Sequence, residues 1–194
     1  VGKIIDYLES QNLIDNTYIF FTSDHGLAVG QHGLIGKQSL YDHSIRVPMI
    51  ISGPNLKKGS RFNQDVYLQD IVPTTLELAN IPVPSEIDFK SFYPIVNNDK
   101  EKSLHNGIYG TFGCCPPKYK DFQRMIRKDG FKLMAFPVNK RIELYNIDFD
   151  PFEKENLSEI PQYKNKIKDM MTDLILLQKE VNDTLNLRKI FELN

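Results

Sequence analysis

Residues 18–48, YIFFTSDHGLAVGQHGLIGKQSLYDHSIRVP, decide the fold and carry most of the chain's chemistry. The stretch begins at residues 18–22 with an uncharged run of aromatic and β-branched side chains. Such a run predicts a strand that is buried on both faces of a parallel sheet. Asp24, His25 and Gly26 follow at once, so they are expected at the carboxyl end of that strand. Open α/β sheets bind their ligands there, and the stretch therefore predicts a functional site.

The rest of this stretch adds further polar and basic residues in a fixed order. Three of the chain's four histidines lie in it. An Asp-His-Gly triplet alone is ordinary turn chemistry. The assembled string is more specific: an aromatic strand, then T-S-D-H-G, G-Q-H-G, G-K and S-I-R-V-P-M-I-I. In this order it resembles the sulfatase family of the alkaline-phosphatase-like superfamily, and in particular iduronate-sulfate-type and bacterial glycan sulfatases.

The resemblance covers most of the chain. Residues 70–79 resemble the helix that follows the family's active-site segment, and residues 124–133 and 143–157 resemble its closing sheet. The resemblance implies an α/β fold. The expected architecture is the C-terminal part of an alkaline-phosphatase-like mixed sheet flanked by helices, with a small four-stranded antiparallel sheet covered by a C-terminal helix.

The family's nucleophile is not visible in these residues. Sulfatases make a formylglycine from Cys or Ser in a C/S-x-P/A-x-R motif near the N-terminal end, beside a pair of metal-binding aspartates. The nearest string here begins at Cys114 and Cys115, has Lys118 in place of the arginine, and follows the Asp-His-Gly segment rather than preceding it. We interpret it as a coincidence. The chain is expected to be the C-terminal part of a larger enzyme, partnered by the missing N-terminal part of its own domain.

Composition excludes several classes of partner. The chain has 194 residues, 41% of them hydrophobic, which is enough to bury a core. Its 24 basic and 25 acidic residues leave a net charge of −1, which gives no reason to expect nucleic-acid binding. No apolar run approaches the length of a membrane span. The adjacent Cys114 and Cys115 indicate neither a disulfide framework nor a zinc site. For the compartment, family resemblance favours the periplasm, secretion or a lysosome-like organelle.

Hydrophobic patterning divides the chain into three parts. Residues 1–84 are predicted to be the C-terminal portion of the main sulfatase α/β domain, with a first helix, a second strand at 47–51 and a helix capped by Asp70. Residues 85–105 are predicted to be a connecting segment, and residues 106–194 a C-terminal α+β subdomain.

The subdomain shows period-two patterning with short turns. Four strands are predicted at residues 107–112, 123–127, 131–136 and 142–147, with a tight hairpin at 128–130. A helix opening at Pro161 is expected to lie across this sheet. Its apolar stripe at alternating steps of three and four is Tyr163, Ile167, Met170, Leu174, Leu177 and Val181.

Cleavage of a sulfate ester develops negative charge on the leaving oxygen, so the site needs a divalent cation and fixed positive groups. Asp24 supplies a hard oxygen ligand suited to Ca²⁺, with Mg²⁺ as the other candidate. Many sulfatases carry Asn at the next position. The resemblance to members with an Asp-His pair implies that His25 also lies at the metal. The alternative is that His25 only hydrogen-bonds behind the metal ligands.

Lys37 is predicted to bind the sulfate and to donate a proton to the leaving oxygen, because a flexible ammonium suits both tasks. The resemblance assigns the family's lysine to this position; the alternative is a solvated surface lysine. His32 is flanked by Gly30 and Gly33, which let the backbone approach a bound group. It is a candidate substrate contact or a structural hydrogen-bonding residue.

The resemblance therefore implies a sulfuric ester hydrolase that removes sulfate from a sulfated carbohydrate. An aromatic loop at residues 109–119 is a candidate wall of the sugar site. The isolated chain is expected to be inactive. Two alternatives stay open: a metal-dependent phosphodiesterase or phosphonate hydrolase of the same superfamily, and a non-catalytic remnant.

Overall fold

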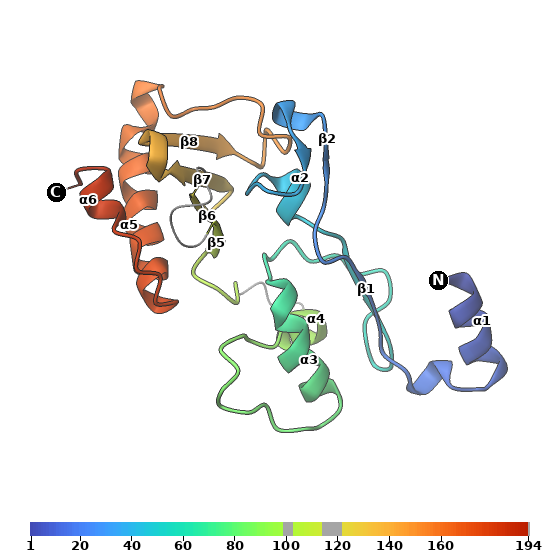
Figure 1. Ribbon diagram of the computed structural model, residues 1–194. Helices are drawn as coiled ribbons and strands as arrows, with labels where there is room; N and C mark the ends of the chain where they lie inside the picture. Colours follow the sequence, from blue (N-terminus) through green and yellow to red (C-terminus); the bar gives the residue numbers. More distant parts are fainter. Residues whose placement is uncertain (99–102, 114–121, 194) are drawn as a thin grey trace. The chain divides into compact units, whose positions relative to one another are not determined.

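The computed structural model describes residues 1–98, 103–113 and 122–193, and the chain falls into two compact units (Figure 1). The first unit combines Val1–Asp24 with Val47–Leu104, and the second combines His25–Arg46 with His105–Asn194. The predicted division at residues 84 and 105 stays a prediction. Cys114, Cys115 and most of the predicted aromatic loop lie outside the described residues.

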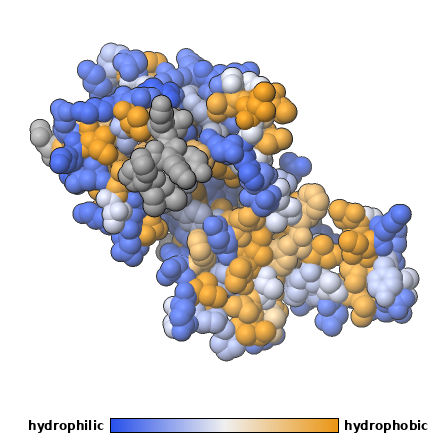
Figure 2. Space-filling view, viewed as in Figure 1, coloured by the Kyte–Doolittle hydropathy of each residue, from blue (hydrophilic) through white to orange (hydrophobic). Residues whose placement is uncertain are grey.

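The first unit has short helices around a two-stranded sheet. Strand β1 pairs antiparallel with β4, with Ile19 opposite Ser52. Hydrophobic residues reach much of the surface in this unit (Figure 2). The elements in chain order are α1 (Gly2–Ser10), the 3-10 turn η1 (Ile14–Asn16), β1 (Ile19–Thr22), β4 (Met49–Ser52), the 3-10 turn η3 (Leu68–Asp70), α3 (Ile71–Leu78) and α4 (Tyr93–Asn98).

The prediction that the first strand is parallel and buried on both faces was wrong for the described residues. Phe20 packs against Phe92 on one face of the sheet, with ring centroids 6.4 Å apart. On the other face Phe21 and Ile50 are 45% and 59% exposed. An uncharged run of residues indicates only that a strand can be buried. Burial on both faces also requires other elements to cover each face of the sheet. Here α4 covers one face.

The predicted helix is confirmed and Asp70 occupies its N-cap position, but the Asp70 side chain makes no capping hydrogen bond to that helix. Its carboxylate accepts hydrogen bonds from the backbone N–H of Tyr67, at 2.8 Å, and of Lys90, at 3.0 Å. Thr74 accepts a hydrogen bond from the N–H of Phe92 at 3.0 Å. The buried Asp70 and Thr74 therefore tie the segment before α4 to α3.

The second unit contains the predicted four-stranded antiparallel sheet, in the order β5-β6-β7-β8. The Asp129-Gly130 connection has positive φ at both residues, +50° and +72°, as a tight two-residue hairpin requires. Glycine is favoured at residue 130 because its φ of +72° lies in the left-handed region that other residues rarely adopt. The strands are β5 (Ile108–Phe112), β6 (Gln123–Lys128), β7 (Phe131–Phe136) and β8 (Arg141–Asn146), with a 3-10 turn, η4 (Pro137–Asn139), between the last two.

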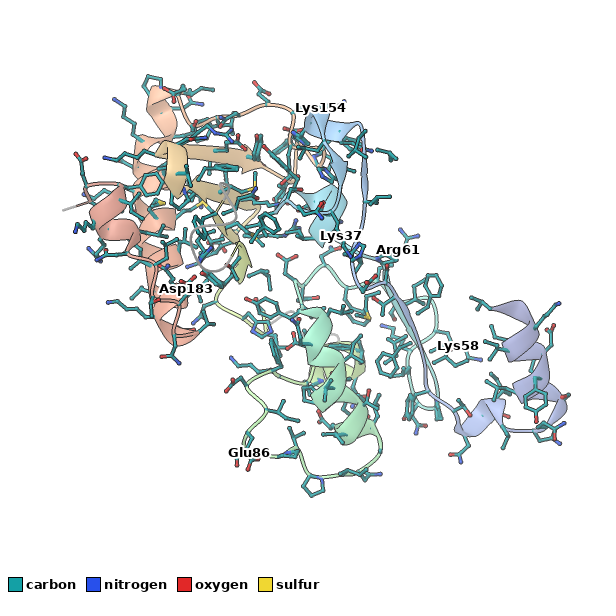
Figure 3. The ribbon with its side chains drawn as sticks, viewed as in Figure 1. Lys37, Lys58, Arg61, Glu86, Lys154 and Asp183 are labelled. Carbon is teal, nitrogen blue, oxygen red and sulfur yellow. The ribbon has the colours of Figure 1, made fainter. Side chains whose placement is uncertain are left out.

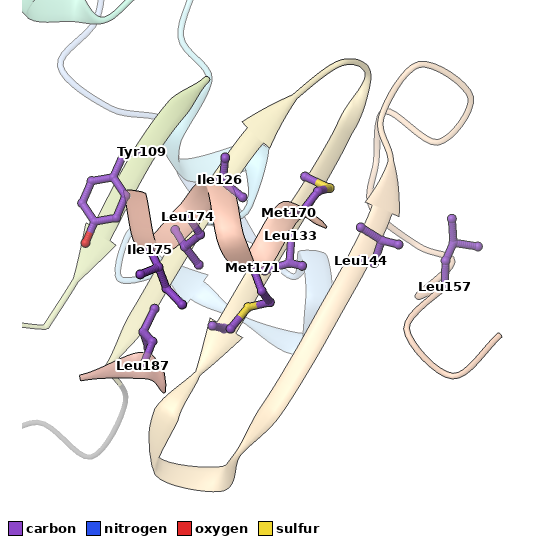
Figure 4. Packing of buried hydrophobic residues seen from close by; sticks show 11 residues of the cluster. Tyr109, Ile126, Leu133, Leu144, Leu157, Met170, Met171, Leu174, Ile175 and Leu187 are labelled. Carbon is purple, nitrogen blue, oxygen red and sulfur yellow. The ribbon is translucent and has the colours of Figure 1, made fainter. Parts of the chain in front are cut away.

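Helix α5 (Lys164–Glu180) covers one face of this sheet, as predicted (Figure 4). It follows the 3-10 turn η5 (Pro161–Tyr163) and precedes α6 (Leu187–Ile190). The predicted stripe is wrong at Val181, which is 56% exposed because α5 ends one residue earlier. The core on this face includes Ile126, Leu133, Leu144, Met170, Met171, Leu174 and Ile175.

The segment that carries the functional motif covers the other face of the sheet. Leu40 and Tyr41 pack there against Met125, Met134 and Tyr145. The segment consists of a small hairpin, β2 (Ala28–Val29) with β3 (Ile35–Gly36), around the 3-10 turn η2 (Gln31–Gly33), followed by α2 (Asp42–Ile45). In the described residues, no helix is both long and apolar enough to cross a membrane.

Asp183, just after α5, fastens that helix to the sheet. It accepts hydrogen bonds from Arg124 of β6 and from the hydroxyl of Tyr109 in β5. Burial raises the pKa of the Asp183 carboxyl, but the hydrogen bonds from Arg124 and Tyr109 outweigh it and lower that pKa to about 2. The ionised carboxylate is therefore favoured in the folded chain.

We expect Asp183→Asn to lower the free energy of unfolding at neutral pH by about 2 kcal/mol. This is the free energy that corresponds to the fall in the Asp183 pKa from 3.8 to about 2 on folding. Because the folded-state pKa lies below the unfolded one of 3.8, this stabilisation is complete above it and is lost as pH falls toward about 2. Urea unfolding followed by circular dichroism at several pH values measures it. Asp173→Asn, in a more exposed pair with Lys128, is the control. A difference that stays constant with pH would contradict the assignment.

Candidate active site

Gly26 fixes how the motif segment enters the second unit. Its N–H donates a hydrogen bond to the carbonyl of Ser44 in α2, at 2.8 Å. A Cβ at this position would lie 2.0 Å from the carbonyl oxygen of His43. The two backbones therefore approach too closely for any residue but glycine. The Asp-His-Gly triplet therefore requires its glycine because of this close backbone contact.

His25 and Lys37 are brought together within the second unit. Lys37 Nζ lies 2.6 Å from His25 Nε2, and His25 Nδ1 lies 2.8 Å from the carbonyl oxygen of Gly26. Because a carbonyl oxygen can only accept, Nδ1 carries a proton and Nε2 is the acceptor for the Lys37 ammonium. The hairpin makes this possible, since Lys37 directly follows β3 (Figure 3). The arrangement directs a cationic amine that can bind an anion or transfer a proton.

Asp24 lies two residues beyond the last residue of β1, at the carboxyl end of the strand. Its Oδ1 is 3.5 Å from Ser23 Oγ, and its side chain is exposed. The chain passes from the first unit to the second between Asp24 and His25. Asp24 is thus an accessible carboxylate at the end of a strand.

These residues fit only part of a metal site. Among the described residues, no group of three or more His, Cys, Asp or Glu side chains could hold a metal ion. Ca²⁺ takes about six to eight oxygen ligands, and Asp24 offers one carboxylate. The Nε2 of His25 accepts from an ammonium in this geometry, so it would be available to a cation only after Lys37 moved.

His32 packs within the second unit through its ring. The imidazole stacks on Tyr41, with centroids 3.9 Å apart and planes 10° from parallel. Its Nε2 lies 3.2 Å from the carbonyl oxygen of Phe152. The backbone at His32 has a φ of +53°, at the turn that joins the hairpin strands. His32 therefore has structural contacts, and its predicted role in substrate binding stays a prediction.

A buried charge cluster, made of Asp42, Arg127, Lys132 and Glu153, holds α2 against the sheet. Lys132 is fully buried, and its Nζ lies 2.8 Å from Asp42 Oδ1 and 2.5 Å from Glu153 Oε1. Arg127 Nη1 lies 3.0 Å from Asp42 Oδ2. Glu153 Oε2 accepts from the N–H of Asp42 at 2.7 Å. Strand, helix start and loop are therefore joined by one network.

Sequence reasoning missed this cluster, although one signal was present. Lys132 interrupts the apolar strand FKLMAF and shares its face with Met134 and Phe136. A lysine on a buried face needs carboxylate partners, because an unpaired buried charge is very costly. The strand pattern cannot name those partners, since Asp42 and Glu153 are distant in sequence.

Two buried tyrosines, Tyr41 and Tyr145, also join the motif segment to the sheet. Tyr41 and Tyr145 both donate to Glu143 Oε2, at 2.7 and 3.0 Å, and Arg141 forms an ion pair with the same carboxylate. Burial raises the pKa of both hydroxyl groups. They therefore stay neutral donors at physiological pH.

We expect Lys132→Met to lower the free energy of unfolding by about 3–5 kcal/mol, because it leaves two buried carboxylates without their shared cation. Urea unfolding of the 194-residue chain measures the change. The matched control is Lys128→Met on the neighbouring strand, where the pair with Asp173 is about one-third exposed and should contribute less than about 1 kcal/mol. Equal effects of the two substitutions would show that burial of the cluster is unimportant.

The match to a family model decides where this chain belongs. Residues 30–180 match the model of the C-terminal region of N-sulphoglucosamine sulphohydrolase. The chain belongs to the sulfatase family. The predicted resemblance and fold class are thereby confirmed.

Individual relatives agree with membership of the sulfatase family. An N-acetylglucosamine-6-O-sulfatase of Bacteroides thetaiotaomicron is 31% identical over 188 residues, which is 94% of this chain and 34% of the relative. The solved structure of BT4656 in complex with its substrate D-glucosamine-2-N,6-O-disulfate superposes with a TM-score of 0.85 at 31% identity, and covers 95% of this chain and 38% of that one. The chain thus spans about a third of the length of the curated relatives it matches.

The fold alone is shared more widely. A phosphonate monoester hydrolase from Silicibacter pomeroyi superposes with a TM-score of 0.80 at 21% identity, over 96% of this chain and 39% of that one. This likeness shows the fold alone, and the sulfatase assignment rests on the family match and the motif.

Proposed function

We propose that the protein of which this chain is a part hydrolyses sulfate esters on a carbohydrate. The observation that carries the proposal is the pairing of Lys37 Nζ with His25 Nε2 at 2.6 Å, in a chain that belongs to the sulfatase family. Relatives whose names specify a sulfated glucosamine make a sulfated amino sugar the first substrate to test.

Each residue has a separate proposed task. The Lys37 ammonium binds a sulfate oxygen and donates a proton to the leaving oxygen, which offsets the charge that develops there. His25 fixes the direction of that ammonium through Nε2. It would join a metal only if Lys37 were displaced.

Asp24 is proposed as one oxygen ligand of a divalent cation, Ca²⁺ or Mg²⁺. A bound cation would offset the negative charge of the sulfate. The formylglycine nucleophile and the remaining ligands would come from parts of the enzyme outside these 194 residues. The isolated chain is then inactive. The proposal includes export to the periplasm, the cell surface or a lysosome-like compartment. His32 is retained as a candidate substrate contact.

We expect Lys37→Ala to lower kcat of the whole enzyme on a glucosamine 6-O-sulfate by about a hundredfold or more, because it removes the charge that stabilises the leaving oxygen. Sulfate release measured by ion chromatography gives the rate. Lys168→Ala on the exposed surface of α5 is the control and should leave kcat unchanged. A whole enzyme that cleaves phosphonate or phosphodiester substrates faster than any sulfated saccharide would contradict the proposal and favour the alternative chemistry.

The role of Asp24 is tested by metal titration. After chelation, the Asp24→Asn enzyme should need at least about tenfold more Ca²⁺ than the unsubstituted enzyme to regain half of its activity, because an amide oxygen carries no net charge. Asp15→Asn, in the exposed turn η1, is the matched control. Identical Ca²⁺ and Mg²⁺ titration curves for the Asp24 variant and the unsubstituted enzyme would remove Asp24 from the metal site.

A further inference from the structure

The second unit contains a pocket that the candidate catalytic pair does not line, although His32, the candidate substrate contact, forms part of its wall. Its volume is about 530 Å³, within the range of small-molecule sites. Three segments line it: the turn η2, the helix α2 with Arg46 after it, and residues 151–154 after β8. Neither His25 nor Lys37 belongs to its lining. The pocket is therefore separate from the candidate catalytic pair, although both lie in one compact unit.

The two carboxylates in the pocket wall are paired with cations that lie beneath the pocket surface. Asp42 is 7% exposed and Glu153 is 2% exposed, and both bind the buried Lys132. Asp42 also pairs with Arg127 at 3.0 Å. These two acidic residues therefore do not make the pocket negative, because two buried cations offset them.

The cations at the pocket surface are left to set its charge. The Arg46 side chain is 62% exposed, and its guanidinium stands 3.9 Å from an Asp42 oxygen that Arg127 approaches more closely. Lys154 is exposed, with Nζ 5.4 Å from the centre of the Phe152 ring (Figure 3). Counting these two with the buried pair, four cations surround two carboxylates. The pocket is thus electropositive and suits an anion.

Its other side chains suit a sugar ring better than a bare ion. Phe152 is 70% exposed and offers an aromatic face to apolar C–H groups. His32, His43 and Gln31 also line the pocket. His32 Nε2 contacts the Phe152 carbonyl oxygen, His43 Nε2 contacts Ser39 Oγ and Gln31 Oε1 accepts from the Val29 N–H. A sugar hydroxyl group would therefore bind to a ring Nδ1 or to the amide nitrogen of Gln31. The His32 and His43 rings lie 5.6 Å apart and form one wall. An aromatic face, polar side chains and two exposed cations together match a carbohydrate that carries negative charge.

We propose that this pocket binds an acidic saccharide unit, a sugar ring bearing a sulfate or a carboxylate group. The choice of a saccharide deepens the proposed function, since the unit would belong to the same class of polymer that the enzyme cleaves. It occupies a site of its own, so it is a further unit of a long substrate or a separate molecule. The wall built on the Lys132 cluster keeps the pocket's shape.

The test measures binding to the 194-residue chain, which requires no turnover. The chain is titrated by calorimetry with four probes: a sulfated glucosamine disaccharide, an unsulfated disaccharide with a uronic acid, a neutral disaccharide and inorganic sulfate. We expect one or both of the acidic disaccharides to bind, weakening as salt rises, and the neutral sugar and inorganic sulfate to bind at least about tenfold more weakly. Comparison of the two acidic probes identifies the anionic group that is recognised.

Variants locate the binding. Lys154→Glu should weaken the acidic disaccharide by about tenfold, because it reverses a charge at the pocket rim. Phe152→Ala should weaken it through loss of the aromatic face, and neither exposed substitution disturbs the core. Lys168→Glu is the matched control, because α5 covers the opposite face of the sheet. This control should leave the affinity unchanged.

Several results would overturn the proposal. They are equal affinity for the neutral disaccharide, equal affinity for inorganic sulfate, and unchanged binding in both Lys154→Glu and Phe152→Ala. Failure of the proposed function is distinguishable, because it appears as an absence of sulfate release by the whole enzyme. If the chain binds an acidic sugar in this pocket but the whole enzyme cleaves another ester, only the proposed reaction is contradicted.

Discussion

The second unit depends on one buried ammonium group. Lys132 has no exposed surface and stands between Asp42 at the start of α2 and Glu153 after β8. A buried charge is tolerated only when partners replace its lost hydration, so the three segments cannot separate without a large penalty. The position of the motif segment on the small sheet is consequently set by electrostatics as well as by the apolar contacts of Leu40 and Tyr41.

This attachment explains how a short hairpin can hold a reactive group. Two-residue strands such as β2 and β3 have little stability of their own. They are fixed at one end by the backbone hydrogen bond from Gly26 to Ser44 and continue at the other into α2. The His25–Lys37 pair lies on this hairpin, and so its geometry depends on the sheet that α2 covers. The motif also links the two units, because the chain crosses between them after Asp24 and again after Arg46.

The same cluster has a second consequence at the surface. Because Lys132 and Arg127 face Asp42 and Glu153 from inside, the acidic side chains contribute little net charge to the pocket in front of them. Arg46 and Lys154 then determine what that pocket attracts. A network that stabilises the fold thus also sets the electrostatic character of an exposed cavity.

The sequence by itself determined the elements and the family. Period-two patterning predicted all four strands of the small sheet, the Asp-Gly pair predicted its tight hairpin, and the motif string predicted the sulfatase resemblance. These features are local, because each is encoded by residues adjacent in the chain. Local signals also produced the errors: an apolar run overstated the burial of β1, and the apolar stripe was extended to Val181.

Only the tertiary structure decided which side chains contact one another across the fold. The pairing of His25 with Lys37, the capture of Lys132 by two carboxylates, and the hydrogen bond from the Lys90 N–H to the Asp70 carboxylate all join residues that no local pattern relates. The physical reason is that periodicity records which face of an element is buried. It carries no information about the group that meets that face, because the partner is chosen by packing and charge after the elements assemble.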